Sequence, residues 1–398
     1  MTSPTKTSSD MAGPKTETAV LYPFLGVHSF LIGLFPFYIP VFLYKNGFSL
    51  SRICAFIAVT ALGFVITLYP WERMARKVSL AILILVSFFS ELLLMTALFI
   101  EKQMVFIIVA GFLNGVFNCH FWMIQRLLFF YTVTPDTSGR KFGNFQIFVL
   151  LVVKAGILAG GALLEKAGFL PVYLATLAVA GAAVAYVVKN RTGITLDPRI
   201  RSSPPLSFRQ VITFRDKSHS RSVFAVDGLF LYLESYFWMI SLFLIVQQNY
   251  WKLGLLVVCL ALFFGLLFVL IKNRIDRLPA GRIYTGAVCL YSLSWLLRGL
   301  LSENLDNISM LLMLAVITFC TSLFRLVFNK RFYDMAAATT GHAYIFMKSY
   351  ISQFFLAAGA MSGVLWLGPG NTVAQLSGIY LAAAALSFVF LLYHFEKR

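Results

Sequence analysis

Charged residues are scarce in this sequence. Asp, Glu, Lys and Arg make up 12% of the 398 residues, whereas 59% of the residues are hydrophobic. Soluble domains carry about 25% charged and about 45–50% apolar residues, so this composition excludes an ordinary soluble domain. Acidic residues are the scarcer kind: 16 Asp and Glu stand against 33 Lys and Arg, which gives a formal net charge of +17.

Cysteine pairs and histidine clusters are also missing. The five cysteines lie in apolar segments and form no Cys-x-x-Cys pair, which argues against a disulfide framework or a zinc site. The five histidines are scattered, and no nucleophile motif accompanies them. We therefore expect no enzyme activity, metal or other cofactor, and a membrane-embedded transferase is the alternative from a different class.

What the chain does contain is a series of long apolar runs. Runs of about 18 or more apolar residues are typical of membrane-spanning helices. Residues 1–19 are polar, lack the pattern of a cleaved signal peptide, and are expected to form a disordered cytoplasmic leader. The sequence therefore predicts an all-α integral membrane protein with 12 transmembrane helices, at roughly 20–44, 51–70, 80–100, 104–132, 142–164, 171–188, 222–246, 253–271, 282–301, 308–332, 342–366 and 373–394.

One polar connection, residues 189–221, is much longer than the others and divides the chain into two halves of six spans. We expect residues 20–188 and 222–398 to form two pseudo-symmetric six-helix bundles, joined by 189–221 as a cytoplasmic loop. Acid–arginine pairs at corresponding places in the two halves, and an arginine in the fourth span of each, indicate an internal duplication.

The basic residues indicate the orientation. With a cytoplasmic N-terminus, 23 of the 33 Lys and Arg residues lie on the inner side and five on the outer side. This asymmetry follows the positive-inside rule and places both termini in the cytoplasm. It also accounts for the basic composition without nucleic-acid binding. The short loops favour a bacterial inner membrane.

Twelve spans, the six-plus-six division and the acid–arginine pairs resemble the major facilitator superfamily over roughly residues 20–395. Residues 69–77, "YPWERMARK", keep the acid, the arginine and the basic tail of the signature after helix 2, although both glycines are replaced. The resemblance implies a monomeric secondary transporter with alternating access and a cavity lined by helices 1, 4, 7 and 10. It also implies that the paired loops act in gating, through Glu72, Arg73, Asp276 and Arg277.

Several polar and charged side chains lie inside the apolar spans. An ionisable group there costs at least a few kcal/mol, so each is a functional-site hypothesis. On the tenth span, Thr318, Ser322, Arg325 and Asn329 fall within about 60° of one another at 3.6 residues per turn. The residues predicted to line a substrate cavity are Arg126, Arg325, Lys348, Asn118, Gln125, Trp122, Ser322, Asn329, Tyr344 and Trp238.

Arg126 and Arg325 occupy the fourth helix of each half and would place two guanidinium groups across the cavity. Arginine recognises carboxylate and phosphate with paired hydrogen bonds. Basic groups outnumber acidic ones on the predicted cavity side, which favours an anionic substrate. The alternative is that these arginines pair internally with Glu234 or with backbone carbonyls, or that Arg126 extends to the membrane surface.

Three titratable groups are candidates for proton coupling. Glu234 is the first because a carboxyl group in an apolar environment can take up and release a proton. Asp227 lies on the same span, and His28 on the first span is a weaker candidate. Glu91 and Arg298 lie on spans expected to face lipid. We expect Arg298 to extend outward and Glu91 to pack against a neighbouring helix.

The leading hypothesis is a proton-coupled transporter of a small organic anion or carboxylate-bearing metabolite, working in a lipid bilayer. Two transport alternatives remain. One is an exporter or importer of a larger amphipathic metabolite such as a siderophore, and the other is a drug or lysolipid transporter. The glycine-rich fifth span, "KAGILAGG" at 154–161, lacks the Gly-Pro element often found in that helix of drug exporters of the superfamily.

Overall fold

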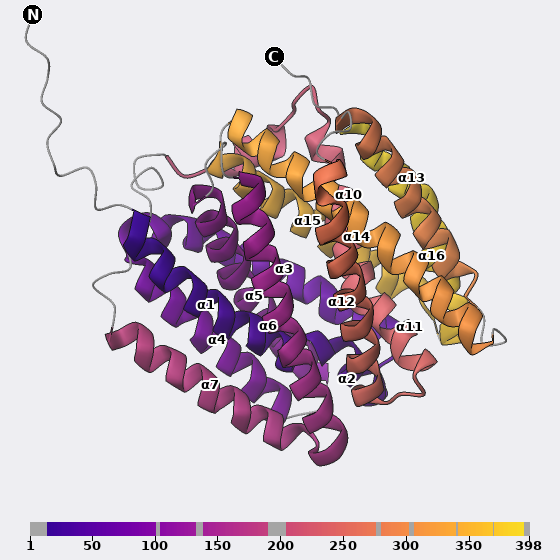
Figure 1. Cartoon of the computed structure of the whole chain (residues 1–398). Coiled ribbons are helices and arrows are strands. Elements are labelled where there is room, and N and C mark those ends of the chain that lie inside the picture. The colour runs from indigo at the N-terminus through magenta and orange to yellow at the C-terminus, as the bar shows by residue number, and fades with distance from the viewer. Residues whose placement is uncertain are drawn as a thin grey trace, which may run out of the picture.

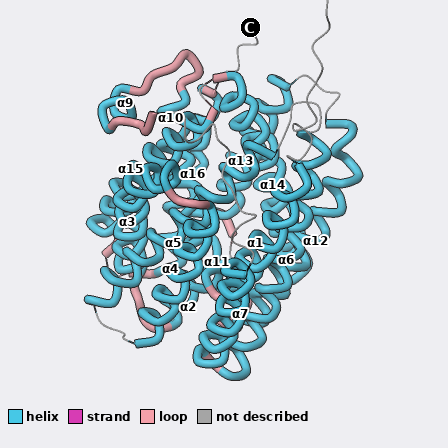
Figure 2. Tube along the Cα trace, turned by 90° about the vertical axis from the view of Figure 1, so that its left-hand side faces the viewer, coloured by secondary structure: helices cyan, strands magenta, loops and turns pink. Residues whose placement is uncertain are grey.

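The computed structural model describes residues 14–100, 104–132, 138–189, 204–275, 280–301, 306–339, 341–368 and 370–393. Every regular element in these ranges is a helix, as Figure 2 shows. The helices are α1 (Pro14–Leu34), η1 (Pro36–Tyr38), α2 (Ile39–Lys45), α3 (Leu50–Lys77), α4 (Leu80–Ile100), α5 (Met104–Thr132), α6 (Ser138–Ala167), α7 (Phe169–Lys189), α9 (Phe208–Thr213), α10 (Ser220–Tyr232), η3 (Leu233–Phe237), α11 (Trp238–Ile245), α12 (Tyr250–Ile275), α13 (Ala280–Gly299), α14 (Asn307–Ala338), α15 (His342–Trp366), α16 (Thr372–Leu386) and η4 (Ser387–Leu392).

Each of the twelve predicted spans is occupied by a helix or by a broken helix. Among the described residues, eight helices are long and apolar enough to cross a membrane. The helices run further than the apolar runs do at several ends. Thus α3 continues through Pro70 to Lys77, so Glu72 and Arg73 lie on its last turns rather than in a loop.

The helices form two groups. Figure 1 shows α1 to α7 on one side of the molecule and α10 to α16 on the other. The groups meet along two helix pairs, α3 with α15 and α6 with α12.

Glycines allow α1 and α6 to cross at close range. A Cβ atom at Gly160 would lie 1.9 Å from the backbone oxygen of Leu34, and one at Gly156 would lie 2.1 Å from that of Phe30. Small residues four apart permit this kind of backbone contact between membrane helices. The glycine-rich sequence of the fifth span is therefore explained by helix packing.

Two spans are interrupted within their length, and the twelfth changes from α16 to the 3-10 helix η4 at its end. The first is divided into α1, η1 and α2, with Pro36 at the start of the 3-10 turn and Pro40 in the first turn of α2. The seventh contains a π-helical turn, η3, between α10 and α11. A π-turn holds one extra residue compared with an α-helix and is frequent at functional sites.

The two groups touch at the end where α2 and α11 finish, which we call the outer end. Lys45 Nζ donates to the backbone oxygen of Gln248 at 3.3 Å and lies 4.4 Å from the centre of the Tyr250 ring. The backbone N–H of Tyr250 donates to Glu165 Oε2 at 2.9 Å. The structure thus has its outer end closed by contacts between the two groups.

Candidate ion-pair site in the membrane interior

An arginine with two acidic partners lies at the centre of the second group of helices. Arg325 of α14 donates from Nη1 to Asp227 Oδ1 of α10 at 2.6 Å. Its Nε donates to Glu234 of η3, at 3.0 Å to Oε2 and 3.2 Å to Oε1. The α-helical period places Arg325 on the inward face of α14, opposite both acids.

Lys348 of α15 completes the network. Its Nζ lies 3.0 Å from Asp227 Oδ2 and 4.4 Å from the centre of the Phe332 ring. Asp227 is fully buried, and its two carboxylate oxygens bridge the cations of Arg325 and Lys348. Two acids and two bases make the network neutral, which is how interior charges are kept in a low-dielectric environment.

Tyr291 of α13 is a member of this site that sequence reasoning missed. Its hydroxyl donates to Glu234 Oε1 at 2.5 Å and accepts from Arg325 Nη2 at 3.4 Å. The ring is fully buried and stacks on Phe324, with the ring centres 4.0 Å apart. The ninth span was expected to face lipid, and a tyrosine among apolar residues gives no signal of an inward position.

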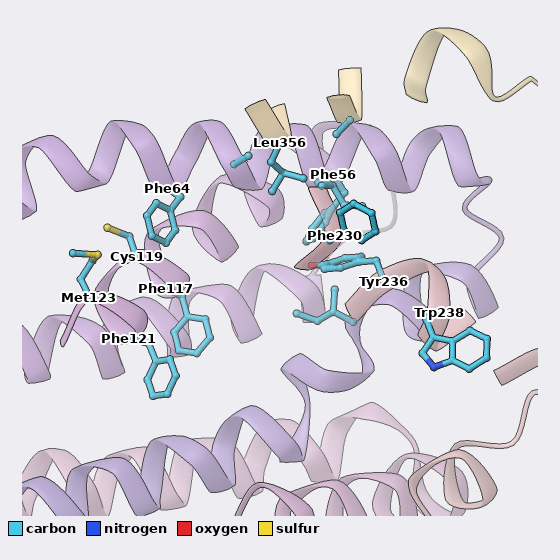
Figure 3. Packing of buried hydrophobic residues seen from close by; sticks show 14 of the residues in the cluster. Phe56, Phe64, Phe117, Cys119, Phe121, Met123, Phe230, Tyr236, Trp238 and Leu356 are labelled. Atoms are coloured by element: carbon cyan, nitrogen blue, oxygen red, sulfur yellow. The ribbon is translucent and has the colours of Figure 1, made fainter. Parts of the chain in front are cut away.

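A row of neutral polar groups lies on α5 in the first group. Asn114 donates to Thr60 Oγ1 at 3.2 Å and to the hydroxyl of Tyr236 at 3.1 Å. Asn118 donates back to Asn114, and Trp122 Nε1 donates to Asn118 Oδ1 at 3.0 Å. The contact with Tyr236, labelled in Figure 3, links this row to η3 of the second group.

Arg126 of α5 has a neutral partner. Its Nη1 donates to Ser349 Oγ of α15 at 2.8 Å. Ser349 directly follows Lys348, whose Nζ contacts Asp227. Arg126 therefore lies beside the ion-pair network, with no ion pair to a carboxylate among the described residues.

The other predicted cavity residues are more dispersed. Gln125 is buried, Ser322 and Asn329 are half-buried on α14, and Trp238 packs against Arg298. Tyr344 shares the helical face of Lys348 but lies one turn away. Its hydroxyl bonds to Ser220 at 2.7 Å and to Tyr393 at 2.8 Å, so it belongs to a separate polar cluster.

The predicted gating residues are only partly described. Glu72 pairs with Arg76 rather than with its neighbour Arg73, at 3.2 Å between Oε1 and Nη2. Arg73 lies over the ring of Tyr69, 3.4 Å from its centre. Asp276 and Arg277 lie outside the described residues.

Arg298 of α13 is buried, contrary to the expectation that it extends outward. Its exposed fraction is 3%, and its guanidinium lies 4.2 Å from the centre of the Trp295 ring and 4.8 Å from that of Trp238. It donates to Ser294 Oγ at 3.1 Å and to Thr321 Oγ1 at 2.8 Å. Ser294 is one turn nearer the start of α13, so the side chain turns back into the bundle.

The described part of the chain offers no group of three or more His, Cys, Asp or Glu side chains placed to hold a metal ion. The paired carboxyl and basic groups of this site offer ion pairing, hydrogen bonding and proton exchange.

No family model matches the chain, and no curated protein sequence matches it. Solved structures do match. The nucleoside transporter NupG is similar with a TM-score of 0.62 and 12% identity, over 96% of this chain and 100% of the other. A point mutant of that transporter is similar with a TM-score of 0.66 and 14% identity, over 93% and 98% of the two chains. The chain therefore has the all-helical membrane fold of the major facilitator superfamily transporters.

Proposed function

We propose that this protein is a secondary active transporter that moves a small polar solute by alternating access, with the interior ion-pair site as its working centre. The transporter fold supports this, and so does the placement of four charged side chains where each costs free energy unless it is paired. Such a site is expected where a solute or a proton passes.

The proposed substrate class rests on one observation: the hydrogen-bond partner of Arg126 is the neutral hydroxyl of Ser349. The other two cations at this site, Arg325 and Lys348, are already paired with acids, whereas Arg126 is held by Ser349 Oγ. A carboxylate or phosphate that replaced the hydroxyl would gain a charge-assisted hydrogen bond. We therefore propose that Arg126 meets the anionic group of a small organic anion.

Glu234 is the proposed proton carrier. It lies between a cation and a hydroxyl, Arg325 and Tyr291, and its side chain is 17% exposed. Protonation would remove its ion pair with Arg325 and leave that arginine with Asp227 alone. Proton uptake would thereby change the charge of the site, which is the requirement for coupling transport to a proton gradient.

A nucleoside is the second candidate substrate class. The row formed by Asn114, Asn118 and Trp122 presents amide and indole groups that suit a neutral, hydrogen-bonding ring system. The similarity in fold to nucleoside transporters agrees with this candidate. It differs from the first because Arg126 would then have no anion to bind.

The membrane setting follows from the same proposal. We propose a plasma membrane of bacterial type, a monomer, and cytoplasmic termini, in line with the inner-side excess of Lys and Arg. The contact of Lys45 with Gln248 then closes the extracellular side. Gating at the cytoplasmic side by the acid–arginine pairs remains part of the proposal.

A thermal-shift binding screen tests the substrate class. Carboxylates, phosphate esters and nucleosides would be tested on the purified wild type, on Arg126→Gln, and on Arg52→Gln as a control at an exposed position. Stabilisation by anions that disappears only in Arg126→Gln is the expected result. Stabilisation by nucleosides alone, equal in all three proteins, would overturn the anion proposal in favour of the second candidate.

A further inference from the structure

Arg298 is a buried cation without an acidic partner among the described residues. Its contacts are two indole rings and the hydroxyls of Ser294 and Thr321, and its Nε has no hydrogen-bond partner there. A permanent charge in a membrane interior is normally paired. The proposed transport cycle gives this arginine no role, so its burial needs a separate explanation.

Arg298 reaches the helix that carries Glu234, because its guanidinium lies 4.8 Å from the ring centre of Trp238, four residues after Glu234. Tyr291, which holds Glu234, lies seven residues before Arg298 on α13, and seven residues bring a helix back to nearly the same face. The Arg298 side chain turns back by one turn to Ser294. Its guanidinium therefore lies about one helical turn, roughly 5 Å, along the same face from Tyr291.

The segment that carries Glu234 lies between two anchored helices. On one side, Gly228 of α10 packs against the backbone of Ser352, which donates to the Phe224 oxygen at 2.7 Å. On the other side, Ser241 of α11 hydrogen-bonds to the Tyr380 hydroxyl at 2.6 Å. Between these anchors lies the π-turn η3, whose polar contacts are made by the side chains of Glu234 and Tyr236.

We propose that Glu234 exchanges ion-pair partners, from Arg325 to Arg298, when the π-turn of η3 rewinds as regular α-helix. A change of one residue in register rotates a side chain by about 100° around the helix. Arg325 keeps Asp227 throughout, and its Nε side becomes available to the solute. Arg298 is thus a positioning residue for Glu234, and this inference rests on the transport cycle proposed above.

The test is a double-mutant cycle on thermal unfolding of the purified protein, which needs no substrate. Glu234→Gln and Arg298→Gln are combined in the wild type and again in an Arg325→Gln background. In the wild type the two effects should add, because Arg325 holds Glu234. In the Arg325→Gln background we expect them to deviate from additivity by about 2 °C or more in Tm, because Glu234 has moved to Arg298.

Three further variants keep the test decisive. If Arg325→Gln does not fold, Tyr291→Phe serves as the background instead. It removes the hydroxyl that binds Glu234 and keeps all the charges. In the Arg325→Gln background, Arg298→Lys keeps the positive charge and should preserve the coupling to Glu234 that Arg298→Gln removes. Arg331 is a matched arginine, stacked 4.1 Å from the Tyr284 ring centre, and Arg331→Gln should remain additive with Glu234→Gln. Additivity in every background would overturn partner exchange. Failure of the transport proposal is seen separately, as unchanged solute flux in Glu234→Gln liposomes.

Discussion

Nδ1 of His28 on α1 lies 3.4 Å from Oε2 of Glu91 on α4, and both side chains are fully buried. The imidazole is stacked on Phe88 with the ring centres 4.0 Å apart, and Phe24 and Phe121 pack around it. Among the described residues the imidazole is the only basic group within ion-pair distance of this carboxyl. The contact is not a hydrogen bond, because neither Glu91 oxygen and neither His28 ring nitrogen has a hydrogen-bond partner there.

Removing one member of this pair should cost more than removing both. His28→Phe leaves the Glu91 carboxyl buried without a partner, and we expect a loss of about 1–3 kcal/mol in the free energy of unfolding. The double variant His28→Phe/Glu91→Leu should recover most of that loss, since packed apolar residues replace a buried pair well. Unfolding of the purified variants measures this, and a double variant that loses the sum of both single effects would contradict it.

Arg325→Gln should be strongly destabilising. It leaves Asp227 and Glu234 with one cation between them, and breaking a buried ion pair costs about 3–5 kcal/mol. The Arg325 side chain is 17% exposed, so we expect the lower part of that range. Denaturant unfolding measures this loss, and wild-type stability in Arg325→Gln would refute the pairing.

Substitutions of Asp227 and of Lys348 should differ in their effect on stability. Asp227→Asn leaves two cations, Arg325 and Lys348, facing one remaining acid. Lys348→Met leaves Asp227 with its arginine, and the new side chain fits the aromatic surroundings. We therefore expect Asp227→Asn to lower the Tm more than Lys348→Met does. The reverse order in thermal unfolding would show that Asp227 is not the bridging group.

Gly160→Ala should reduce the yield of folded protein. The added methyl group would lie 1.9 Å from the Leu34 oxygen, and overpacking of this kind costs about 1–3 kcal/mol. Gly181→Ala on α7 is the matched control, because nothing lies within 4 Å of its Cβ position. Alanine there should be neutral or slightly stabilising. Equal size-exclusion yields for both variants would argue against the close crossing of α1 and α6.

Helical periodicity predicts which face of a span a residue occupies, and this brought Asp227, Glu234, Arg325 and Lys348 into the candidate site. It does not predict how deep in the helix bundle a side chain lies or which residue it contacts. Tyr344 shares a face with Lys348 yet bonds to Ser220 near the start of α10. The boundaries of the two predicted bundles also remain a prediction. Apolar runs end before the helices do, so they do not fix the bounds of a helix.

Other features depend on tertiary packing and have no local signal. The π-turn at Leu233–Phe237 arises between two anchored segments and has no marker such as proline in its own sequence. The inward turn of Arg298 depends on two tryptophans that lie on α11 and α13. Tyr291 could have been found only by knowing that α13 faces Glu234.

The link between the two helix groups is fastened at both sides. Glu72 Oε1 accepts from the backbone N–H of Leu206 at 2.8 Å, and Arg76 donates to the oxygen of Pro204 at 3.0 Å. Directly after this, α9 packs against α15 of the second group (Figure 2). Leu206 and its neighbours therefore connect the end of α3 to α15. A movement that separates the two helices at this end has to break either the hydrogen bonds of Glu72 and Arg76 to residues 204–206 or the packing of α9 on α15, in addition to the direct packing of α3 on α15.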